Sequence, residues 1–514
     1  MTGVEEQTHI NRSAWITLAI LSCLGLITMY GETMVLPAIP DFIQDFNISY
    51  STSSWILSSY LIAGAVMTPI AGRLSDIYGK KKMLLIVMAV YSTGILAGGF
   101  ANSIEFMLAA RAAQGVGMSM FPIAFGIIRE ILPEKKLAIG QTIFSSTFSG
   151  GAVVGLMVGA TIIQNFGWQA TFFSIFPIAV ILGLVIRKII HVRDPSTMAA
   201  KVKEGGGQEQ EEVRNGKKDY SSSSSSTTTN TQTIDVKGTL ALAVTIISFL
   251  AGISFLESSS TANTGFQVVA LFSVAAVSLA VFIVIEKKVS SPLLDLKLMT
   301  HRMILPATII LMLVFLCMFM VYQTIPIMVR SPQPLGFGGD AVVTANVQLP
   351  FMIVLLIGTI MSGFILNKVG NTRLTLLGTI ISAIGFFSLL LFHSTEYMVS
   401  VSLTIISAGL SLSITGGFNV VLLSAPIQMT GIALGMALLL NLVGMSIGPS
   451  IAAMFQQMYQ GTVEGVIGEQ FPTQEAYNLI FLTAALISLA SVALGLALAR
   501  RKIVAGKIPF TASP

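Results

Sequence analysis

Two charged residues stand deep inside apolar stretches of this sequence, and the carboxyl group of one of them can bind and release a proton. Glu32 lies in LITMYGETMVLPAIP (26–40), and Arg111 opens RAAQGVGMSM (111–120). An ionisable residue inside a membrane-spanning segment is costly, so it is a functional-site hypothesis by default. Within the spans predicted below, Glu32 is the one deep acid and Arg111 the one deep base.

Burial favours the neutral form of a carboxyl group, so Glu32 can bind a proton and release it when water or a cation arrives. A proton and a cationic compound would then compete for one carboxylate. The structural alternative is a neutral, hydrogen-bonded acid or an ion pair with Arg111. For Arg111 the alternative is a side chain that snorkels to the membrane interface. Gln114 follows Arg111 by three residues and shares its helical face.

The elements that must position these residues are membrane helices. Of the 514 residues, 54% are hydrophobic and 10% charged, against roughly 25% charged in an average soluble domain. Residues 137–186 and 397–463 contain no charge, and a spanning helix needs about 20 apolar residues. The composition predicts an all-α polytopic membrane protein rather than a β-barrel, whose strands would alternate in short segments. The first apolar run is expected to remain as a signal-anchor.

We predict fourteen transmembrane helices with both termini in the cytoplasm. In this orientation all Lys and Arg residues except Arg111 and Arg330 lie on cytoplasmic segments or at span ends, as the positive-inside rule requires. The same rule explains the net charge of +5 without a nucleic-acid partner. Cys23 and Cys317 lie far apart in predicted spans, so neither a disulfide nor a metal site is expected. The predicted spans are residues 14–36, 53–72, 83–101, 106–128, 138–164, 168–187, 238–257, 265–285, 303–329, 341–366, 374–393, 397–424, 430–456 and 477–499.

The composition divides the chain into four parts. Residues 188–236 are rich in Ser, Thr, Gly and charge and cannot bury enough apolar surface to order themselves. They are predicted to form a disordered cytoplasmic linker, either a plain spacer or a phosphorylation site. A six-helix bundle is expected before it (1–187), then two inserted helices with their following loop (237–302), then a second six-helix bundle (303–514).

The two predicted bundles contain matching motifs. GRLSDIYGKKK (72–82) follows the second span as GFILNKVGNTR (363–373) follows the tenth, and GGAVVGLMVGA (150–160) matches VGMSIGPSIAA (443–453). Both pairs lie at nearly the same spacing, which indicates duplication. Internal repeats with a site between them near mid-membrane are a common architecture of secondary transporters.

These motifs resemble those of a known family. GRLSDIYGKKK resembles the loop signature of the major facilitator superfamily, RAAQGVGMSM its Arg-x-x-Gln-Gly signature, and GGAVVGLMVGA its Gly-x-x-x-Gly-Pro antiporter signature. Fourteen spans, with EKKVSSPLLDLKLM (286–299) after the inserted pair, resemble the 14-helix drug:proton antiporter branch. Three positions depart from the family pattern: Thr28 replaces an Asp, Ile77 a basic residue and Leu156 a Pro.

The resemblance implies a major facilitator fold that exports small amphipathic or cationic compounds in exchange for protons by alternating access. The Leu156 departure leaves a proton-coupled uptake symporter open, and a transporter-like membrane receptor is a second alternative. The nucleotide-binding Gly-x-x-x-x-Gly-Lys-Ser pattern is absent, so ATP drive is not expected. We expect no enzyme activity, no cofactor and no metal, and a monomer in the plasma-membrane bilayer.

The predicted site residues fall into four groups. Glu32 and Arg111 are assigned to proton coupling. The resemblance implies an inner gate, in which Asp76 pairs with Arg73 or Arg129 between the turn glycines Gly72 and Gly79. Close helix packing is assigned to Gly151, Gly155, Gly444, Gly448 and Pro449. The candidate residues of the substrate cavity are Tyr30, Gln114, Gln141, Tyr322, Gln323, Asn346 and Asn419.

Overall fold

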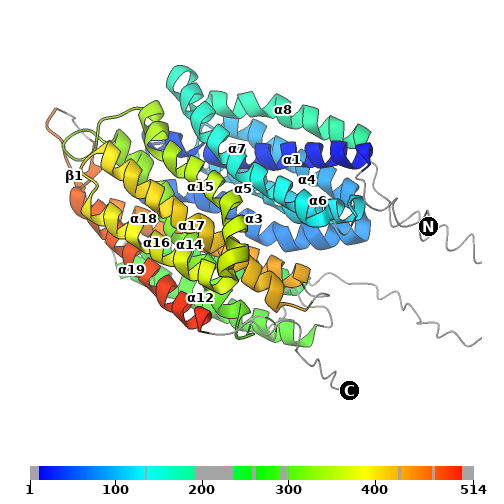
Figure 1. Cartoon of the computed structure of the whole chain (residues 1–514). Helices are drawn as coiled ribbons and strands as arrows, with labels where there is room; N and C mark the ends of the chain where they lie inside the picture. Colours follow the sequence, from blue (N-terminus) through cyan, green and yellow to red (C-terminus); the bar gives the residue numbers. More distant parts are fainter. Residues whose placement is uncertain are drawn as a thin grey trace, which may run out of the picture.

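The computed structural model describes residues 11–133, 136–190, 236–256, 262–289, 298, 300–426, 430–465 and 469–500. Apart from its two ends, the predicted linker at 188–236 lies outside these residues. The described chain is almost entirely helical, and Figure 1 shows its helices lying side by side in one elongated assembly. The predicted all-α fold is confirmed.

The N-terminal bundle contains eight α-helices and two short 3₁₀ segments among its described residues. Two of the α-helices, α5 and α6, are halves of one span. The elements are α1 (Arg12–Thr33), η1 (Leu36–Ala38), α2 (Ile39–Asp45), α3 (Tyr50–Tyr78), α4 (Lys80–Gly99), α5 (Ile104–Gly115), η2 (Val116–Ser119), α6 (Met120–Ile131), α7 (Leu137–Phe166) and α8 (Trp168–Ile189), of which α2 is too short to span.

The remaining described helices form the inserted pair and the C-terminal bundle. A two-stranded antiparallel ribbon, β1 (Gln460–Gly461) with β2 (Phe471–Pro472), precedes the last helix. The helices are α11 (Val236–Leu256), α12 (Ala262–Lys288), α14 (Ile304–Arg330), α15 (Ala341–Val369), α16 (Asn371–Leu391), α17 (Glu396–Ser424), α18 (Thr430–Met458) and α19 (Gln474–Ala499).

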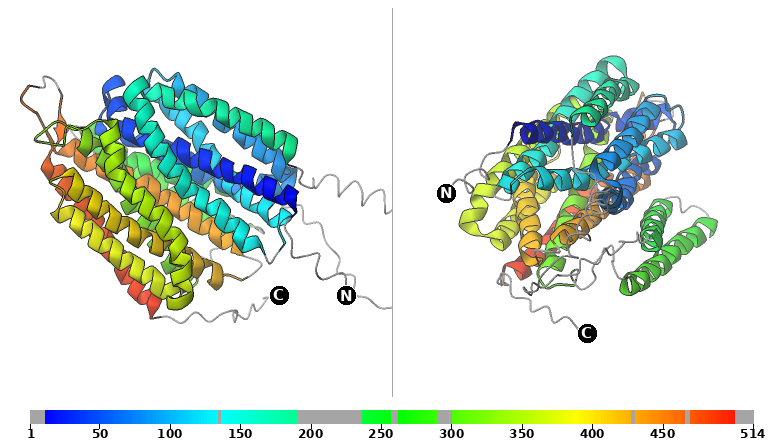
Figure 2. Two further views of the ribbon diagram at one scale, coloured as in Figure 1. Left: turned by 45° about the horizontal axis from the view of Figure 1, so that its top comes forward. Right: turned by 90° about the vertical axis from the view of Figure 1, so that its right-hand side faces the viewer.

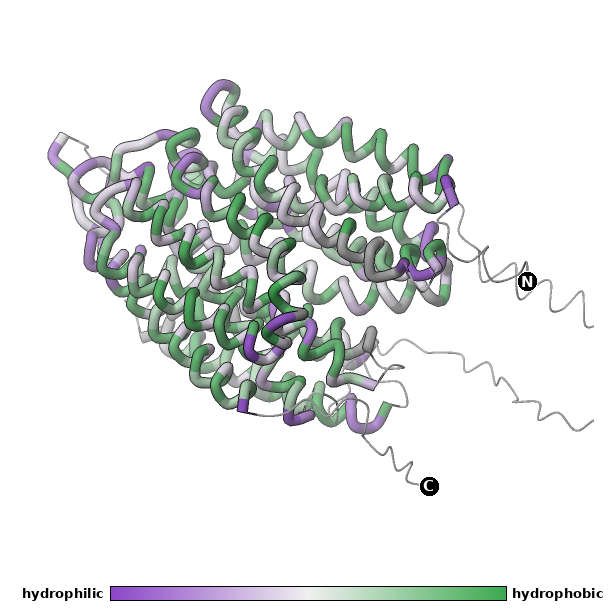
Figure 3. Tube along the Cα trace, in the orientation of Figure 1, coloured by the Kyte–Doolittle hydropathy of each residue, from purple (hydrophilic) through white to green (hydrophobic). Residues whose placement is uncertain are grey.

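All fourteen predicted spans have a helical counterpart among the described residues. Twelve described helices are long and apolar enough to cross a membrane. The other two spans correspond to α11, whose apolar core is shorter, and to the broken helix formed by α5, η2 and α6. Figure 3 shows green, apolar residues along the lengths of the helices and purple, hydrophilic ones gathered toward their ends.

Two spans that the sequence predicted as single helices are interrupted. The first ends at Thr33, before η1 and α2, where Pro37 and Pro40 lack the N–H that a continuing helix would use. The fourth breaks into η2 between Gly115 and Met120, where two glycines weaken the helix. Apolar periodicity alone does not register such breaks, because both segments remain hydrophobic.

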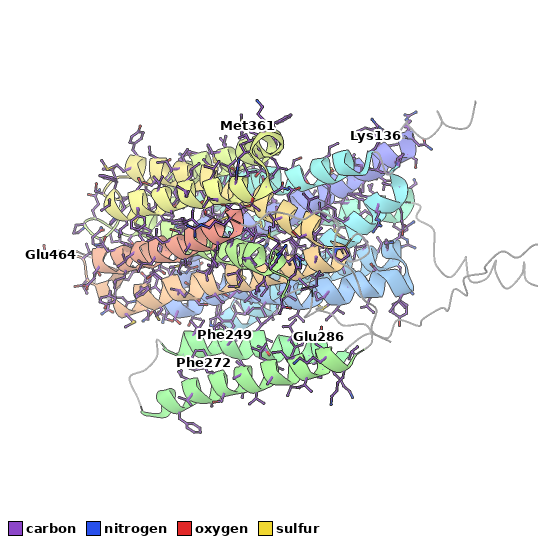
Figure 4. The ribbon with its side chains drawn as sticks, turned by 60° about the horizontal axis from the view of Figure 1, so that its bottom comes forward. Lys136, Phe249, Phe272, Glu286, Met361 and Glu464 are labelled. Carbon is purple, nitrogen blue, oxygen red and sulfur yellow. The ribbon has the colours of Figure 1, made fainter. Side chains whose placement is uncertain are left out.

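The two bundles repeat the same packing and meet along two helix pairs. In the N-terminal bundle α1 packs on α7, and in the C-terminal bundle α14 packs on α18. Between the bundles α3 packs on α18, and α7 on α15. The inserted pair lies beside both bundles in Figures 2 and 4, with α11 against α3 and α18 and the rings of Phe249 and Phe272 5.7 Å apart.

The repeated glycines lie where the paired helices touch. A Cβ atom on Gly151 would stand 2.9 Å from the Met29 Cβ atom of α1. A Cβ atom on Gly448 would stand 2.9 Å from the Met320 backbone nitrogen of α14. Gly155 and Gly444 meet the same partner helices just as closely. Small residues therefore let these helix backbones approach each other.

Candidate functional site

Basic and acidic residues are unequally distributed between the two ends of the bundles. Lys136 and Glu464 mark these ends in Figure 4. The end that carries Arg12, Lys80 and Lys136 is here called the basic end. The opposite end, where α17 and α19 begin with Glu396 and Glu475 in their first turns, is called the acidic end.

Glu32 lies in the last turn of α1 and faces the protein interior. Its side chain is 6% exposed, so it does not face lipid. Its Oε2 atom is buried and has no hydrogen-bond partner in the part of the chain that the structure describes. A buried carboxyl oxygen without a donor is a ready site for a proton or a cation.

Arg111 is fully buried in α5 and is held by α1 and α3. Its Nε atom donates to the Ile56 carbonyl of α3 at 3.1 Å, and its Nη1 atom donates to the Gly31 carbonyl of α1 at 3.2 Å. Its guanidinium carbon lies 4.6 Å from the centre of the Tyr60 ring, a cation–π geometry. The Gly31 carbonyl belongs to the last turn of α1, where carbonyls lack helical partners, so Arg111 caps α1.

Gln114 fixes the orientation of Arg111. Its Oε1 atom accepts a second bond from Nη1 of Arg111 at 2.7 Å, and its Nε2 atom donates to the Gly94 carbonyl of α4 at 3.1 Å. Both ends of the amide are therefore occupied. Gln114, which the sequence predicts as a cavity residue, links Arg111 to α4 through these two hydrogen bonds.

Glu32 and Arg111 form no direct ion pair in this structure, although their side chains lie within electrostatic reach of each other. Tyr60 of α3 and Tyr322 of α14 also lie close enough to the Glu32 carboxyl to interact with it electrostatically. Since Tyr322 belongs to the C-terminal bundle, Glu32 faces the boundary between the bundles. The Nε and Nη1 atoms of Arg111 donate to backbone carbonyls and to Gln114. Its Nη2 atom and the Oε2 atom of Glu32 are both buried without a hydrogen-bond partner among the described residues.

Two neighbouring residues of α14 complete this region. The Tyr322 hydroxyl lies 3.6 Å from the Met352 sulfur, and its ring lies 5.0 Å from that of Phe319. Gln323 donates from Nε2 to the Ser53 hydroxyl of α3 at 3.0 Å. Its Oε1 atom is buried without a partner among the described residues. Gln323 thus ties the two bundles together beside Glu32.

An ion pair joins the bundles at the acidic end. Arg330 of α14 contacts Asp41 of α2 through two parallel bonds, Nη1 to Oδ2 at 2.5 Å and Nη2 to Oδ1 at 2.6 Å, and also donates to the Pro37 carbonyl at 3.2 Å. One turn along α2, Asp45 accepts a bond of 2.7 Å from the Trp168 indole nitrogen. The short helix α2 is therefore held by both bundles.

Further hydrogen bonds between the bundles lie on the same side. The Tyr50 backbone nitrogen donates to Gln457 at 3.1 Å, and the Ser58 hydroxyl donates to the Ser446 carbonyl at 3.0 Å. All of these contacts occupy the acidic half of α3. The described polar contacts thus close the assembly at its acidic end.

The basic end contains the turn predicted as an inner gate. Gly79 joins α3 to α4 with φ of 96°, and Gly370 joins α15 to α16 with φ of 86°, a left-handed conformation that favours glycine. Lys80 forms an ion pair with Glu130 at the end of α6, beside the exposed Arg129. Gly72 lies within α3. The side chains of Arg73 and Asp76 lie outside the described part of the structure, as does that of Gln141.

The other predicted cavity residues differ in their surroundings. Tyr30 lies on the side of α1 that packs against Gly155 of α7, and Asn419 donates to the Thr415 carbonyl of its own helix at 2.8 Å. Asn346 is exposed on the same face of α15 as Ile353. The sequence reasoning missed Tyr60 and Ser53, neutral residues in a span where no charge marks them.

Comparison with known proteins identifies the family of this chain. The model of the Major Facilitator Superfamily matches residues 21–449. Multidrug resistance protein 3 of Bacillus subtilis is 26% identical over 78% of this chain and 70% of its own length. Multidrug efflux pump LfrA of Mycolicibacterium smegmatis is 25% identical over 84% of this chain and 78% of its own length.

Solved structures show the same fold at low identity. A bacterial homologue of the human lysosomal transporter Spinster, in an inward-facing conformation, has a TM-score of 0.61 at 13% identity and covers 95% of this chain and 98% of its own. The xylose transporter XylE of E. coli, partially occluded and inward open, has a TM-score of 0.58 at 13% identity and covers 93% of this chain and 97% of its own.

Proposed function

Because the chain belongs to the major facilitator superfamily, we propose that it exports small amphipathic or cationic compounds across the plasma membrane in exchange for protons. The observation that carries the proposal is the buried Glu32 carboxyl, with an unpartnered oxygen at the boundary between the bundles. The family members that resemble it include multidrug resistance and efflux proteins.

We assign the basic end to the cytoplasm, because Lys and Arg concentrate on cytoplasmic segments. The closed acidic end then faces outward, and the structure corresponds to an inward-facing state. A cationic compound would bind the Glu32 carboxylate from the cytoplasm. Rocking of the two bundles would expose the site to the outside, where a proton displaces the cation and the protonated carrier returns.

The inner gate belongs to the same proposal. In the outward-facing state the turn between α3 and α4 would close against the C-terminal bundle. Gly72 and Gly79 allow the close approach, and Asp76 pairs with Arg73 or Arg129. The ion pair between Lys80 and Glu130 already holds the basic ends of α4 and α6 together, so the N-terminal bundle can move as one body.

Proton release in inverted vesicles tests the proposal. With an imposed pH gradient, a cationic substrate should dissipate the gradient in wild type, and Glu32→Gln should abolish this response because the amide cannot exchange a proton. Glu105→Gln, at an exposed acid in the first turn of α5, is the matched control and should behave as wild type. Unchanged coupling in Glu32→Gln would remove Glu32 from the mechanism. Substrate entry together with protons would favour uptake instead.

A further inference from the structure

Gln348 stands at the centre of the buried face of α15. Residues on either side of it on this face are buried, among them Thr344 and Met352, while Ile353 and Ile357 on the opposite face are exposed. Gln348 itself is 2% exposed. Since α15 turns 100° per residue, this phase directs the Gln348 side chain into the protein rather than toward lipid.

The amide of Gln348 has neither a donor nor an acceptor partner among the described residues. Buried polar groups are normally hydrogen-bonded, and each exception calls for an explanation. At membrane depth the cost of an unpaired amide is high, because lipid offers no alternative partner. A leucine at this position would have avoided the cost. A polar group at Gln348 is therefore better explained by a ligand than by the fold.

The neighbours of Gln348 place it near the Glu32 region. Met352, one helical turn further on the same face, touches the Tyr322 hydroxyl at 3.6 Å, and the Phe351 ring lies 5.7 Å from the Tyr322 ring. Tyr322 lies within electrostatic reach of Glu32. Helix α15 also packs against η1, which follows Glu32 in the chain. Gln348 thus lies about one turn from this site toward the acidic end.

Gln323 supplies a second unpaired group from the adjoining helix. It follows Tyr322 directly, its Nε2 atom is occupied by Ser53, and its Oε1 atom is buried and unpartnered among the described residues. The C-terminal bundle therefore presents one amide donor and two amide acceptors from α14 and α15, all of them neutral. The N-terminal bundle presents the carboxyl of Glu32.

We infer that Gln348, together with the Oε1 atom of Gln323, forms a neutral hydrogen-bonding subsite that selects the polar groups of the transported cation. This inference rests on the proposed function. Glu32 receives the positive charge, and Gln348 and Gln323 receive amine, amide or hydroxyl groups of the same molecule. A site built around such amides favours compounds that satisfy them over compounds that leave them unpaired.

Two probes of equal charge test the inference. Ethidium carries two aromatic amines, whereas tetraphenylphosphonium has no group that can donate or accept a hydrogen bond. Gln348→Leu should lower ethidium export roughly three- to tenfold, the worth of about one hydrogen bond, and leave tetraphenylphosphonium export unchanged. Gln267→Leu, at an exposed glutamine of the inserted helix α12, is the matched control and should change neither.

Thermal stability of the purified, ligand-free variants separates binding from folding. Gln348→Leu should melt at or above the wild-type temperature, because it removes an unpaired amide. An equal loss of both probes, unchanged ethidium export, or a lowered melting temperature would overturn the subsite. If wild type itself exports neither probe against a proton gradient, the proposed function fails instead, and the subsite with it.

Discussion

Breaking the ion pair between Asp41 and Arg330 should open the acidic end of the protein. The pair is bidentate and each side chain is 21% exposed. Hydrogen bonds to charged groups contribute about 1.5–3 kcal/mol when buried, whereas exposed ion pairs contribute about 0.2–1 kcal/mol. For this half-buried pair we expect about 1–2 kcal/mol, which corresponds to about a 5- to 30-fold change in a conformational equilibrium.

Ser53 provides a sensor for this opening. It is fully buried where α3 meets Gln323, so a cysteine there should be shielded while the acidic end is closed. In a background without Cys23 and Cys317, Ser53→Cys should react with a membrane-impermeant maleimide on intact cells. Asp41→Asn or Arg330→Gln should raise the labelling rate by about 5- to 30-fold.

Three controls make the result decisive. Ser394→Cys, exposed in the loop before α17, should label at one rate in every variant. Exchange of the charges in Asp41→Arg with Arg330→Asp should restore slow labelling. Asp45→Asn removes the other carboxylate of α2, which is bonded within the N-terminal bundle, and should have little effect. If labelling of Ser53→Cys stays the same without the ion pair, or rises equally with Asp45→Asn, the pair does not hold the acidic end closed.

Three further predictions concern folding and are measured on detergent-solubilised protein. Gly151→Leu should reduce the yield of folded protein, because its side chain would overlap α1, whereas Gly150→Leu should be tolerated because a Cβ there meets no atom within 4 Å. Gln114→Leu should lower stability by about 1–3 kcal/mol, seen as a lower melting temperature, since it strips a partner from Arg111. Gly79→Val should be destabilising at φ of 96°, and a melting temperature equal to wild type would show that the turn relaxes.

The architecture could be predicted from the sequence because the positions of charged residues and of glycines depend directly on membrane spanning and helix packing. Charge-free runs mark membrane spans, and the repeated glycines mark the contacts of α1 with α7 and of α14 with α18. The rarity of charge in spans also singled out Glu32 and Arg111. The breaks at η1 and η2 were not predicted, because both segments keep their apolar composition.

Neutral polar residues were harder to place. Asn346 and Gln348 are two residues apart in α15, which puts them on nearly opposite faces. The sequence predicts Asn346 as a cavity residue and does not single out Gln348; in the structure Asn346 is exposed and Gln348 is buried. The phase of a helix that is apolar on every side is set by its neighbours in the bundle, and one sequence alone does not reveal them.

The 3₁₀ segment η2 gives the fourth span a joint between two rods of twelve residues each. The rod α5 holds Arg111 and is fastened to α1, α3 and α4, while α6 reaches the basic end. A short 3₁₀ segment inside a helix often marks a hinge. If α6 changes its direction, the backbone should therefore bend at η2, and Arg111 in α5 should keep its position. The basic end of the fourth span could then change direction while the contacts of Arg111 with α1 and α3 stay in place.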